Sequence, residues 1–236
     1  MKVRVAYLEE PPFYWTGPTG APTGADIELA DVVLRAVGVT AVEYHKTSFE
    51  ELLPGVNSSL WDMNVPIFVT AERAQHVAFS VPVWTIGDGF VVHRGNPKAV
   101  TSYEAVATRS DARLGVIPAQ VQYKAAKSAG VSDRQLVEFK DQPEAVAALL
   151  AGTIDAFTGT ALGGRVLADE NQQLEAVSLA ASSKGSSPVG AFSFGKNNLR
   201  LVDAVNQELR RYLGSSDHRT RMAKYGFTSA EIDGVL

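Results

Sequence analysis

One segment of the sequence joins a buried strand, a polar turn and an arginine. Residues 63–69 are mostly apolar and are predicted to form a buried strand that leads through a short polar turn to Arg73. The planar guanidinium of arginine matches a carboxylate through two parallel hydrogen bonds. In α/β sheets, ligands bind beyond the carboxyl ends of the strands, which is where Arg73 is expected. The alternative is a surface arginine paired with Glu72 or Asp62.

The sequence carries no recognised catalytic or metal-binding motif. HExxH, the P-loop, GxGxxG and GxSxG are all absent. The four histidines, at positions 45, 76, 93 and 218, are scattered, whereas a metal site needs clustered ligands. The chain has no cysteine, which excludes a thiolate site, a cysteine nucleophile and a disulfide. We therefore expect a binding protein without catalytic residues, metal ions or cofactors.

Strands and helices alternate along the chain, which favours an α/β fold with mostly parallel sheets. The apolar spacing predicts helices over 26–37 and 199–213. Ser48 as N-cap with Glu51 three residues later predicts a helix over 48–56, and another helix is expected over 119–129. The small polar stretch 182–188 is expected to be a loop. Each half repeats the order strand, helix, strand, helix, strand, so we expect two lobes.

Composition narrows the possible partners. The 236 residues include 22 Lys and Arg against 26 Asp and Glu, which gives a net charge of −4. This balance has no electrostatic footprint for nucleic acid. No apolar run approaches the roughly 18 residues of a membrane span. The chain starts at once in a strand-like pattern, so no signal peptide is expected in it, and a cytosolic protein or a mature exported domain are both open.

Residues 70–84 resemble a family signature, T-x-x-R-x-x-x-V-x-F-S-x-P-Y. The signature belongs to the periplasmic solute-binding proteins of polar amino-acid ABC transporters, family 3 of the bacterial extracellular solute-binding proteins. Three further pieces are similar to the family in order and spacing: P-P-F at 11–13 with G-A-D-I-E-L at 24–29, L-G-V-I at 114–117, and G-T-I-D-A at 152–156. The resemblance extends over essentially the whole chain.

The resemblance implies a two-lobe clamp of the periplasmic-binding-protein type II fold, with a mostly parallel sheet flanked by helices in each lobe. Lobe one would be residues 1–88 plus 193–236 and lobe two 93–188, with hinge crossings near 89–92 and 189–192. The ligand would close the hinge because it binds the closed state better. The resemblance also implies a periplasmic monomer, with its signal peptide removed, that serves the membrane permease of an ABC importer.

The family motif, carried over residue by residue, gives Arg73 the ligand carboxylate. Backbone groups around Pro66 and Phe68 would frame the same end of the ligand. The helix expected to begin near Ala119 would offer N–H groups from lobe two. Gln120 stands where the family usually has threonine or serine, and it would hydrogen-bond the ligand.

The chain departs from the family where the ligand ammonium is normally held. The acidic residue expected five positions after Asp155 is Thr160, and a neutral hydroxyl cannot compensate a desolvated ammonium. Glu10, just before P-P-F, supplies a carboxylate instead. That arrangement resembles ectoine-binding members of the family, which also carry an aromatic residue where Phe68 stands, five positions before Arg73.

The expected site is therefore dipolar. Arg73 would take an anionic end of the ligand, Glu10 a cationic end, and aromatic side chains would stack on a flat cation, namely Phe13, Phe68 and either Phe49 or Trp84. The alternatives are a buried aromatic core and a solvated Glu10. A small zwitterion such as ectoine fits best, and a polar amino acid whose ammonium binds Glu10 is the second candidate.

Two other classes of function stay open at this point. Some relatives resemble dehydratases of cyclic carboxylic acids, in which Glu10 could act as a general acid. Thr158, Thr160 and Gln120, the polar residues expected on the lobe-two side, do not titrate near neutrality, so a second catalytic group is missing. A ligand-sensing module fused to another domain is the third class.

Overall fold

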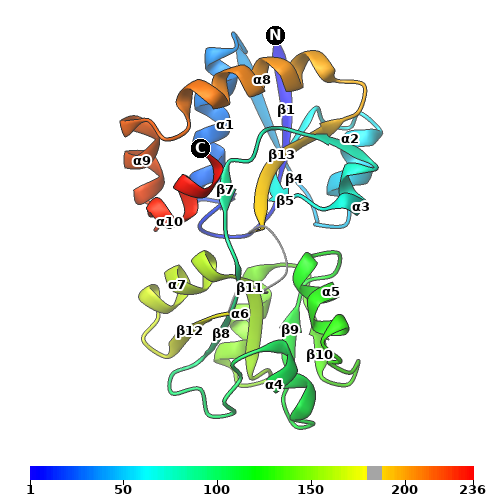
Figure 1. Cartoon of the computed structure of the whole chain (residues 1–236), viewed down its shortest axis with the longest axis vertical. Helices are drawn as coiled ribbons and strands as arrows, with labels where there is room; N and C mark the ends of the chain where they lie inside the picture. Colours follow the sequence, from blue (N-terminus) through cyan, green and yellow to red (C-terminus); the bar gives the residue numbers. More distant parts are fainter. Residues whose placement is uncertain (180–187) are drawn as a thin grey trace. The chain divides into compact units, whose positions relative to one another are not determined.

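The computed structural model describes residues 1–179 and 188–236, so most of the predicted loop 182–188 lies outside the described residues. The chain divides into two compact units (Figure 1). Unit 1 comprises Met1–Ile86 and Ser187–Leu236, and unit 2 comprises Gly87–Ser186. Residues 89–92 lie in strand β8 of unit 2, and residues 189–192 lie in strand β13 of unit 1. Their role as hinge crossings stays a prediction.

Unit 1 is built on a sheet of order β4-β1-β5-β13-β6, with β7 also paired to β13. Its strands are β1 (Lys2–Tyr7), β4 (Ala41–Lys46), β5 (Met63–Phe68), β6 (Val77–Phe79), β7 (Trp84–Thr85) and β13 (Val189–Gly195). A hairpin of β2 (Trp15–Thr16) and β3 (Pro22–Thr23) stands apart. The helices are α1 (Ala25–Ala36), α2 (Leu52–Asn57), α3 (Ala71–Ala74), α8 (Leu199–Tyr212), α9 (Ser216–Ala223) and α10 (Ser229–Ile232), and a 3-10 turn spans Asp233–Val235.

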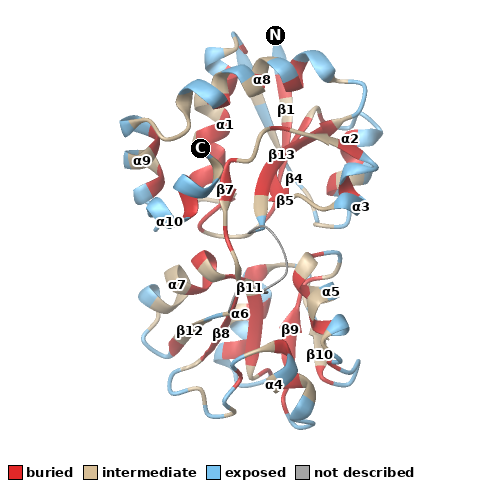
Figure 2. Ribbon diagram, viewed as in Figure 1, coloured by how far each residue is buried: buried red, intermediate tan, exposed pale blue. Residues whose placement is uncertain are grey.

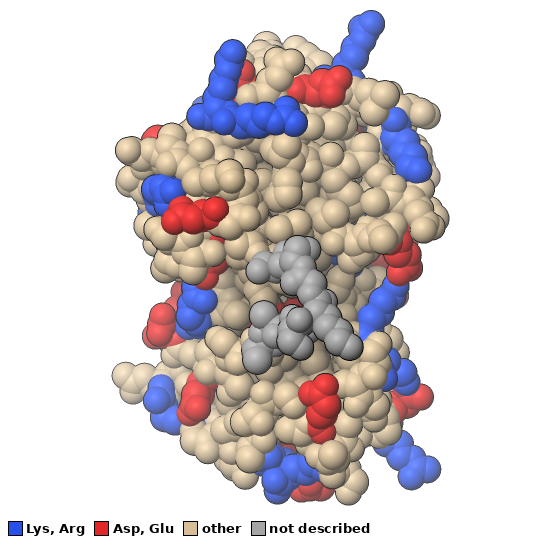
Figure 3. All heavy atoms as spheres, in the orientation of Figure 1, with Lys and Arg blue, Asp and Glu red and all other residues tan. Residues whose placement is uncertain are grey.

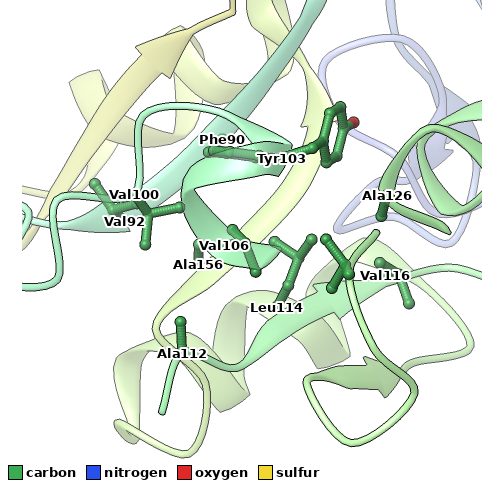
Figure 4. Close-up of a cluster of buried hydrophobic side chains, with 11 residues drawn as sticks. Phe90, Val92, Val100, Tyr103, Val106, Ala112, Leu114, Val116, Ala126 and Ala156 are labelled. Carbon is green, nitrogen blue, oxygen red and sulfur yellow. The ribbon is translucent and has the colours of Figure 1, made fainter. Parts of the chain in front are cut away.

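Unit 2 repeats the design with the sheet order β10-β9-β11-β8-β12. Its strands are β8 (Asp88–His93), β9 (Leu114–Val116), β10 (Leu136–Glu138), β11 (Ala156–Thr160) and β12 (Leu174–Ser178). Its helices are α4 (Tyr103–Thr108), α5 (Val121–Ser128), α6 (Gln142–Leu150) and α7 (Ala161–Glu170). Apolar side chains of β8, β9 and β11 pack against α4 and α5, with Phe90, Leu114 and Val106 among them (Figure 4).

Burial follows the amphipathic pattern of the sequence. The inner strands of both sheets are buried and the outward faces of the helices are exposed (Figure 2). Helix α8 shows this most clearly, because Leu201, Val205 and Leu209 recur on the buried side of a helix whose other side is polar. Within the described part of the chain, no helix combines the length and apolar character needed to cross a membrane.

Both sheets contain parallel and antiparallel strand pairs, which corrects the expectation that most pairs are parallel. In unit 1, β13 runs antiparallel to β5, β6 and β7. In unit 2, β8 runs antiparallel to β11 and β12. Parallel neighbours need a crossover connection, usually a helix, between them. Strands β8 and β13 are the first strands after the chain passes from one unit into the other, so neither follows a crossover helix of its own sheet.

Two predicted helix starts were wrong. Helix α2 begins at Leu52 rather than at Ser48, because Pro54 has no N–H to donate to the preceding turn. The first bond of the helix is then Gly55 N–H to the Glu51 carbonyl, at 2.9 Å. Helix α5 begins at Val121 rather than at Ala119, because Ala119 has a φ of 64°, in the left-handed region.

Candidate functional site

Arg73 lies in a one-turn helix directly after the buried strand β5. The Thr70 hydroxyl caps this helix by accepting a hydrogen bond from the Arg73 backbone N–H at 3.1 Å. The guanidinium folds back onto the strand end, where Nη1 donates to the Phe68 carbonyl at 2.8 Å. The residue is only 8% exposed. Strand, cap and carbonyl therefore fix the direction of a guanidinium that is withdrawn from solvent.

The surroundings of this guanidinium are aromatic and acidic. Its Cζ lies 5.1 Å from the centre of the Phe49 ring, which is a cation–π contact. Burial lowers the pKa of Arg73, while Tyr14, Glu72 and Glu10 raise it. An arginine side chain stays protonated in proteins, so the charge is retained.

Glu10 and Tyr14 face each other across a tight turn. The Glu10 N–H donates to the Tyr14 carbonyl at 2.8 Å, and the Tyr14 hydroxyl lies 3.5 Å from Glu10 Oε2. Burial raises the pKa of Tyr14 well above its usual value, and the charges of Glu10 and Asp26 add to this while Arg73 opposes it. The Tyr14 hydroxyl therefore lies within electrostatic reach of both the Glu10 carboxylate and the Arg73 guanidinium.

Aromatic rings form a continuous chain beside these charges. The centroids of Phe68 and Trp84 are 5.2 Å apart, and those of Trp84 and Phe13 are 5.7 Å apart. Phe13 is 2% exposed and also packs edge-on against Phe227 at 5.8 Å. Phe13 is thus part of the core of unit 1, whereas Phe49 and Phe68 are only partly buried. Stacking of Phe13 on a ligand stays a prediction.

Pro66 lies inside β5, where a proline removes a ladder hydrogen bond. The register with β13 shifts at this point, between the pairs Ile67–Ala191 and Asn64–Ser193. One residue of β13 therefore faces two of β5, and the irregularity accommodates the missing N–H. Pro66 itself is buried, so the framing role expected of it concerns its backbone.

Asp26 is a carboxyl group whose environment the sequence did not reveal. It is fully buried in the first turn of α1, and its Oδ2 accepts from the Trp84 indole N–H at 3.4 Å. Its Oδ1 has no hydrogen-bond partner among the described residues. Burial raises the pKa of Asp26 well above its usual value. The segment 24–29 served only as a family marker in the sequence, although a buried polar side chain there can orient Trp84.

The residues expected to act from lobe two share one edge of the unit 2 sheet. Strands β9 and β11 are parallel neighbours, so their carboxyl ends lie at the same edge. Gln120 is the N-cap residue of α5 and is 5% exposed. Thr160 caps α7 by accepting from the Gly163 N–H at 3.0 Å. Thr158 is fully buried, and its hydroxyl is 2.8 Å from that of Tyr103.

The surface charges give no sign of a polyanion-binding face in the view drawn. In the view of Figure 3, lysine and arginine side chains are scattered among aspartate and glutamate side chains, and most of the described surface is uncharged. Among the described residues, no three His, Asp or Glu side chains come close enough to hold a metal ion.

Several known proteins with similar sequences or structures are solute-binding proteins. A family model described as bacterial extracellular solute-binding proteins, family 3, matches residues 3–228. The chain is 25% identical over 240 residues to the probable amino-acid ABC transporter periplasmic-binding protein y4tE of Sinorhizobium fredii, covering 99% of this chain and 79% of that protein.

Two solved structures share the fold over nearly the whole chain. The crystal structure of EhuB in complex with hydroxyectoine has a TM-score of 0.86 and 26% identity, and covers 97% of this chain and 89% of EhuB. An ancestral arginine-binding protein bound to arginine has a TM-score of 0.81 and 26% identity, and covers 95% of this chain and 97% of that protein. These similarities confirm the predicted fold of type II periplasmic-binding proteins.

Proposed function

Because the chain belongs to the bacterial extracellular solute-binding proteins, family 3, we propose that it captures one small zwitterionic ligand and presents it to the membrane permease of an ABC importer. The family consists of binding receptors of amino-acid transport rather than enzymes. A periplasmic location, a monomeric state and closure of the hinge on the ligand belong to the same proposal.

The observation that carries the proposal is that unit 1 brings a buried guanidinium and a carboxylate near the same tyrosine hydroxyl. The Glu10 carboxylate lies 3.5 Å from the Tyr14 hydroxyl, and the Arg73 guanidinium, which contacts the Phe49 ring and the Phe68 carbonyl, acts electrostatically on the same hydroxyl. A carboxylate of the ligand would bind Arg73 through parallel hydrogen bonds. A cationic group would bind Glu10 and lie against the partly exposed aromatic rings.

A compact ligand with a delocalised cation suits this arrangement, so an ectoine-like compatible solute is our first candidate. The similarity to EhuB, described with hydroxyectoine bound, supports it. A polar amino acid whose ammonium binds Glu10 is the second candidate, and the equal identity to an arginine-binding protein favours it. In either case Gln120, Thr158 and Thr160 would add hydrogen bonds from unit 2.

Calorimetric titration with a panel of solutes tests the proposal. The panel contains ectoine, hydroxyectoine, arginine, glutamine and glycine betaine. We expect at least one zwitterion to bind the parent protein, and to bind Arg73→Ala and Glu10→Gln more weakly. No binding across the panel by the folded protein would contradict the proposal. A cyclohexadienyl acid is added as a substrate test, because its turnover would establish the dehydratase alternative instead.

A further inference from the structure

Asp88 places a carboxylate at the ligand edge of unit 2, where sequence reasoning expected only neutral groups. It is the first residue of β8, which runs antiparallel to β11. Because of this direction, Asp88 lies at the edge where β9 and β11 end, and it stands directly opposite Thr160 in the register. Opposite residues of an antiparallel pair project from the same face of the sheet.

The hydrogen bonds around Asp88 hold it as an acceptor. Gln122 Nε2 donates to Oδ1 at 2.8 Å, and the Tyr103 hydroxyl donates to Oδ2 at 3.2 Å. Because Tyr103 gives its only hydroxyl proton to Asp88, Thr158 must be the donor in the 2.8 Å bond between Thr158 and Tyr103. The donors of this network are all aimed toward the carboxylate, which favours its ionised form.

Among the residues that the structure describes, this carboxylate has no counter-ion. Over residues 1–179 and 188–236, no lysine, arginine or histidine forms an ion pair with Asp88. The side chain is partly buried, and burial raises its pKa against the effect of the two hydrogen bonds. A partly desolvated carboxylate without a cation is costly, and a bound cation would remove that cost.

We propose that Asp88 is a ligand-binding residue of unit 2 that accepts hydrogen bonds from a protonated nitrogen of the transported solute. The inference rests on the proposed function and sharpens it. Ligands with a cationic N–H group, such as a primary ammonium, a guanidinium or a cyclic amidinium, are favoured. Betaines are not, because a quaternary nitrogen has no hydrogen to donate. Tyr103, whose hydroxyl is bonded in turn to Thr158, orients the carboxylate through its hydrogen bond to Oδ2.

Titrating arginine, ectoine and glycine betaine against the parent, Asp88→Asn and Asp133→Asn tests this inference. Asp88→Asn keeps the size of the side chain and removes its charge, so the affinity for whichever N–H cation binds should fall about tenfold or more. Betaine binding, where present, should change far less. Asp133→Asn is the matched control, because it removes the same charge from a unit 2 side chain that is 83% exposed and pairs with Lys127 at the surface, so it should keep the parent's affinity.

The outcomes separate the two proposals. Binding of N–H cations by Asp88→Asn at the parent's affinity, while Arg73→Ala fails to bind them, would overturn the role of Asp88 and leave the proposed function intact. An equal loss in Asp133→Asn and Asp88→Asn would also overturn it, because the change of net charge alone would then account for the loss. If the folded parent binds none of the solutes, both proposals fail. Asp88→Ser gives the same comparison if Asp88→Asn does not fold.

Discussion

Replacing Arg73 with alanine is the most direct test of the site in unit 1. The guanidinium is 8% exposed, gives one donor to the Phe68 carbonyl and lies over the Phe49 ring. A ligand carboxylate bound there would form a desolvated ion pair with the guanidinium. Truncating one partner of such a pair costs about 2–5 kcal/mol, which corresponds to a loss of affinity of about 30-fold to several thousand-fold. Arg73→Ala is therefore expected to lower the affinity for every carboxylate ligand by at least about 30-fold.

Two further variants separate charge from geometry. Arg73→Lys keeps the positive charge and loses the planar fork, so its affinity should fall between those of the parent and Arg73→Ala. Arg211→Ala is the matched control, because the Arg211 side chain is 76% exposed and pairs with Glu208 at the surface. Its affinity should equal that of the parent. Calorimetry at neutral pH gives all four dissociation constants, and thermal unfolding shows whether each variant is folded.

The result that would refute the reasoning is a folded Arg73→Ala protein that binds the same ligand within twofold of the parent. The ligand carboxylate would then lie elsewhere, and the bond from Arg73 to the Phe68 carbonyl would have a structural role only. An affinity of Arg73→Lys as low as that of Arg73→Ala would instead show that the fork geometry, and not the charge, accounts for binding.

Three other expectations concern single side chains. Glu10→Gln should lower the affinity for cationic ligands about tenfold or more and leave the affinity for purely anionic ligands unchanged. If calorimetry shows no change for either kind of ligand, Glu10 is a solvated loop carboxylate with no role in binding. The pKa of Asp26 is raised, so the folded state binds a proton that the unfolded state releases, and the protein should lose stability as pH rises above about 4. Asp26→Asn should therefore gain stability relative to the parent with rising pH in urea titrations, and a difference that is independent of pH would contradict this. Burial lowers the pKa of His218 to about 4 from 6.5, so the unfolding free energy should fall as pH drops through that window. His218→Gln should show a shallower decline, and an unchanged slope would exclude His218 as its cause.

Local sequence patterns were enough to predict the position of Arg73 after a buried strand and the family of the protein. The signature around 70–84 places the arginine after a buried strand, and its cap, Thr70, lies only three residues away. Four motif pieces in the right order predicted the fold, because they resemble the corresponding segments of a family with that fold. Interactions of this kind are short-range, so the sequence records them directly.

Long-range packing could not be predicted in the same way. Phe13 is buried because Phe227, more than two hundred positions later, packs against it. The bulge at Pro66 depends on pairing with β13, which the local sequence of β5 does not specify. Asp88 sits between two glycines in a segment without a motif, and only the register with β11 brings it to the side of Thr160.

The reversed strand in each sheet brings residues next to the unit boundaries close to candidate ligand-binding groups. In unit 2, β8 starts at the edge where β9 and β11 end, so its first residue, Asp88, lies among the candidate ligand groups. In unit 1, the start of β13 lies beside the end of β5, because the Val69 N–H donates to the Val189 carbonyl at 2.9 Å and Gly190 pairs with Phe68.

Asp88 and Gly190 have opposite effects on their sheet edges. Asp88 adds a charge to the edge of the unit 2 sheet. Gly190 leaves the corresponding edge of the unit 1 sheet without a side chain. A Cβ on Gly190 would come within 2.1 Å of the Trp84 ring, so the glycine leaves the space in which the indole contacts both Phe13 and Phe68. In each unit, a substitution at the first residues of the reversed strand would therefore change the charge at the unit 2 edge or the aromatic packing at the unit 1 edge, without altering the motifs that specify the fold.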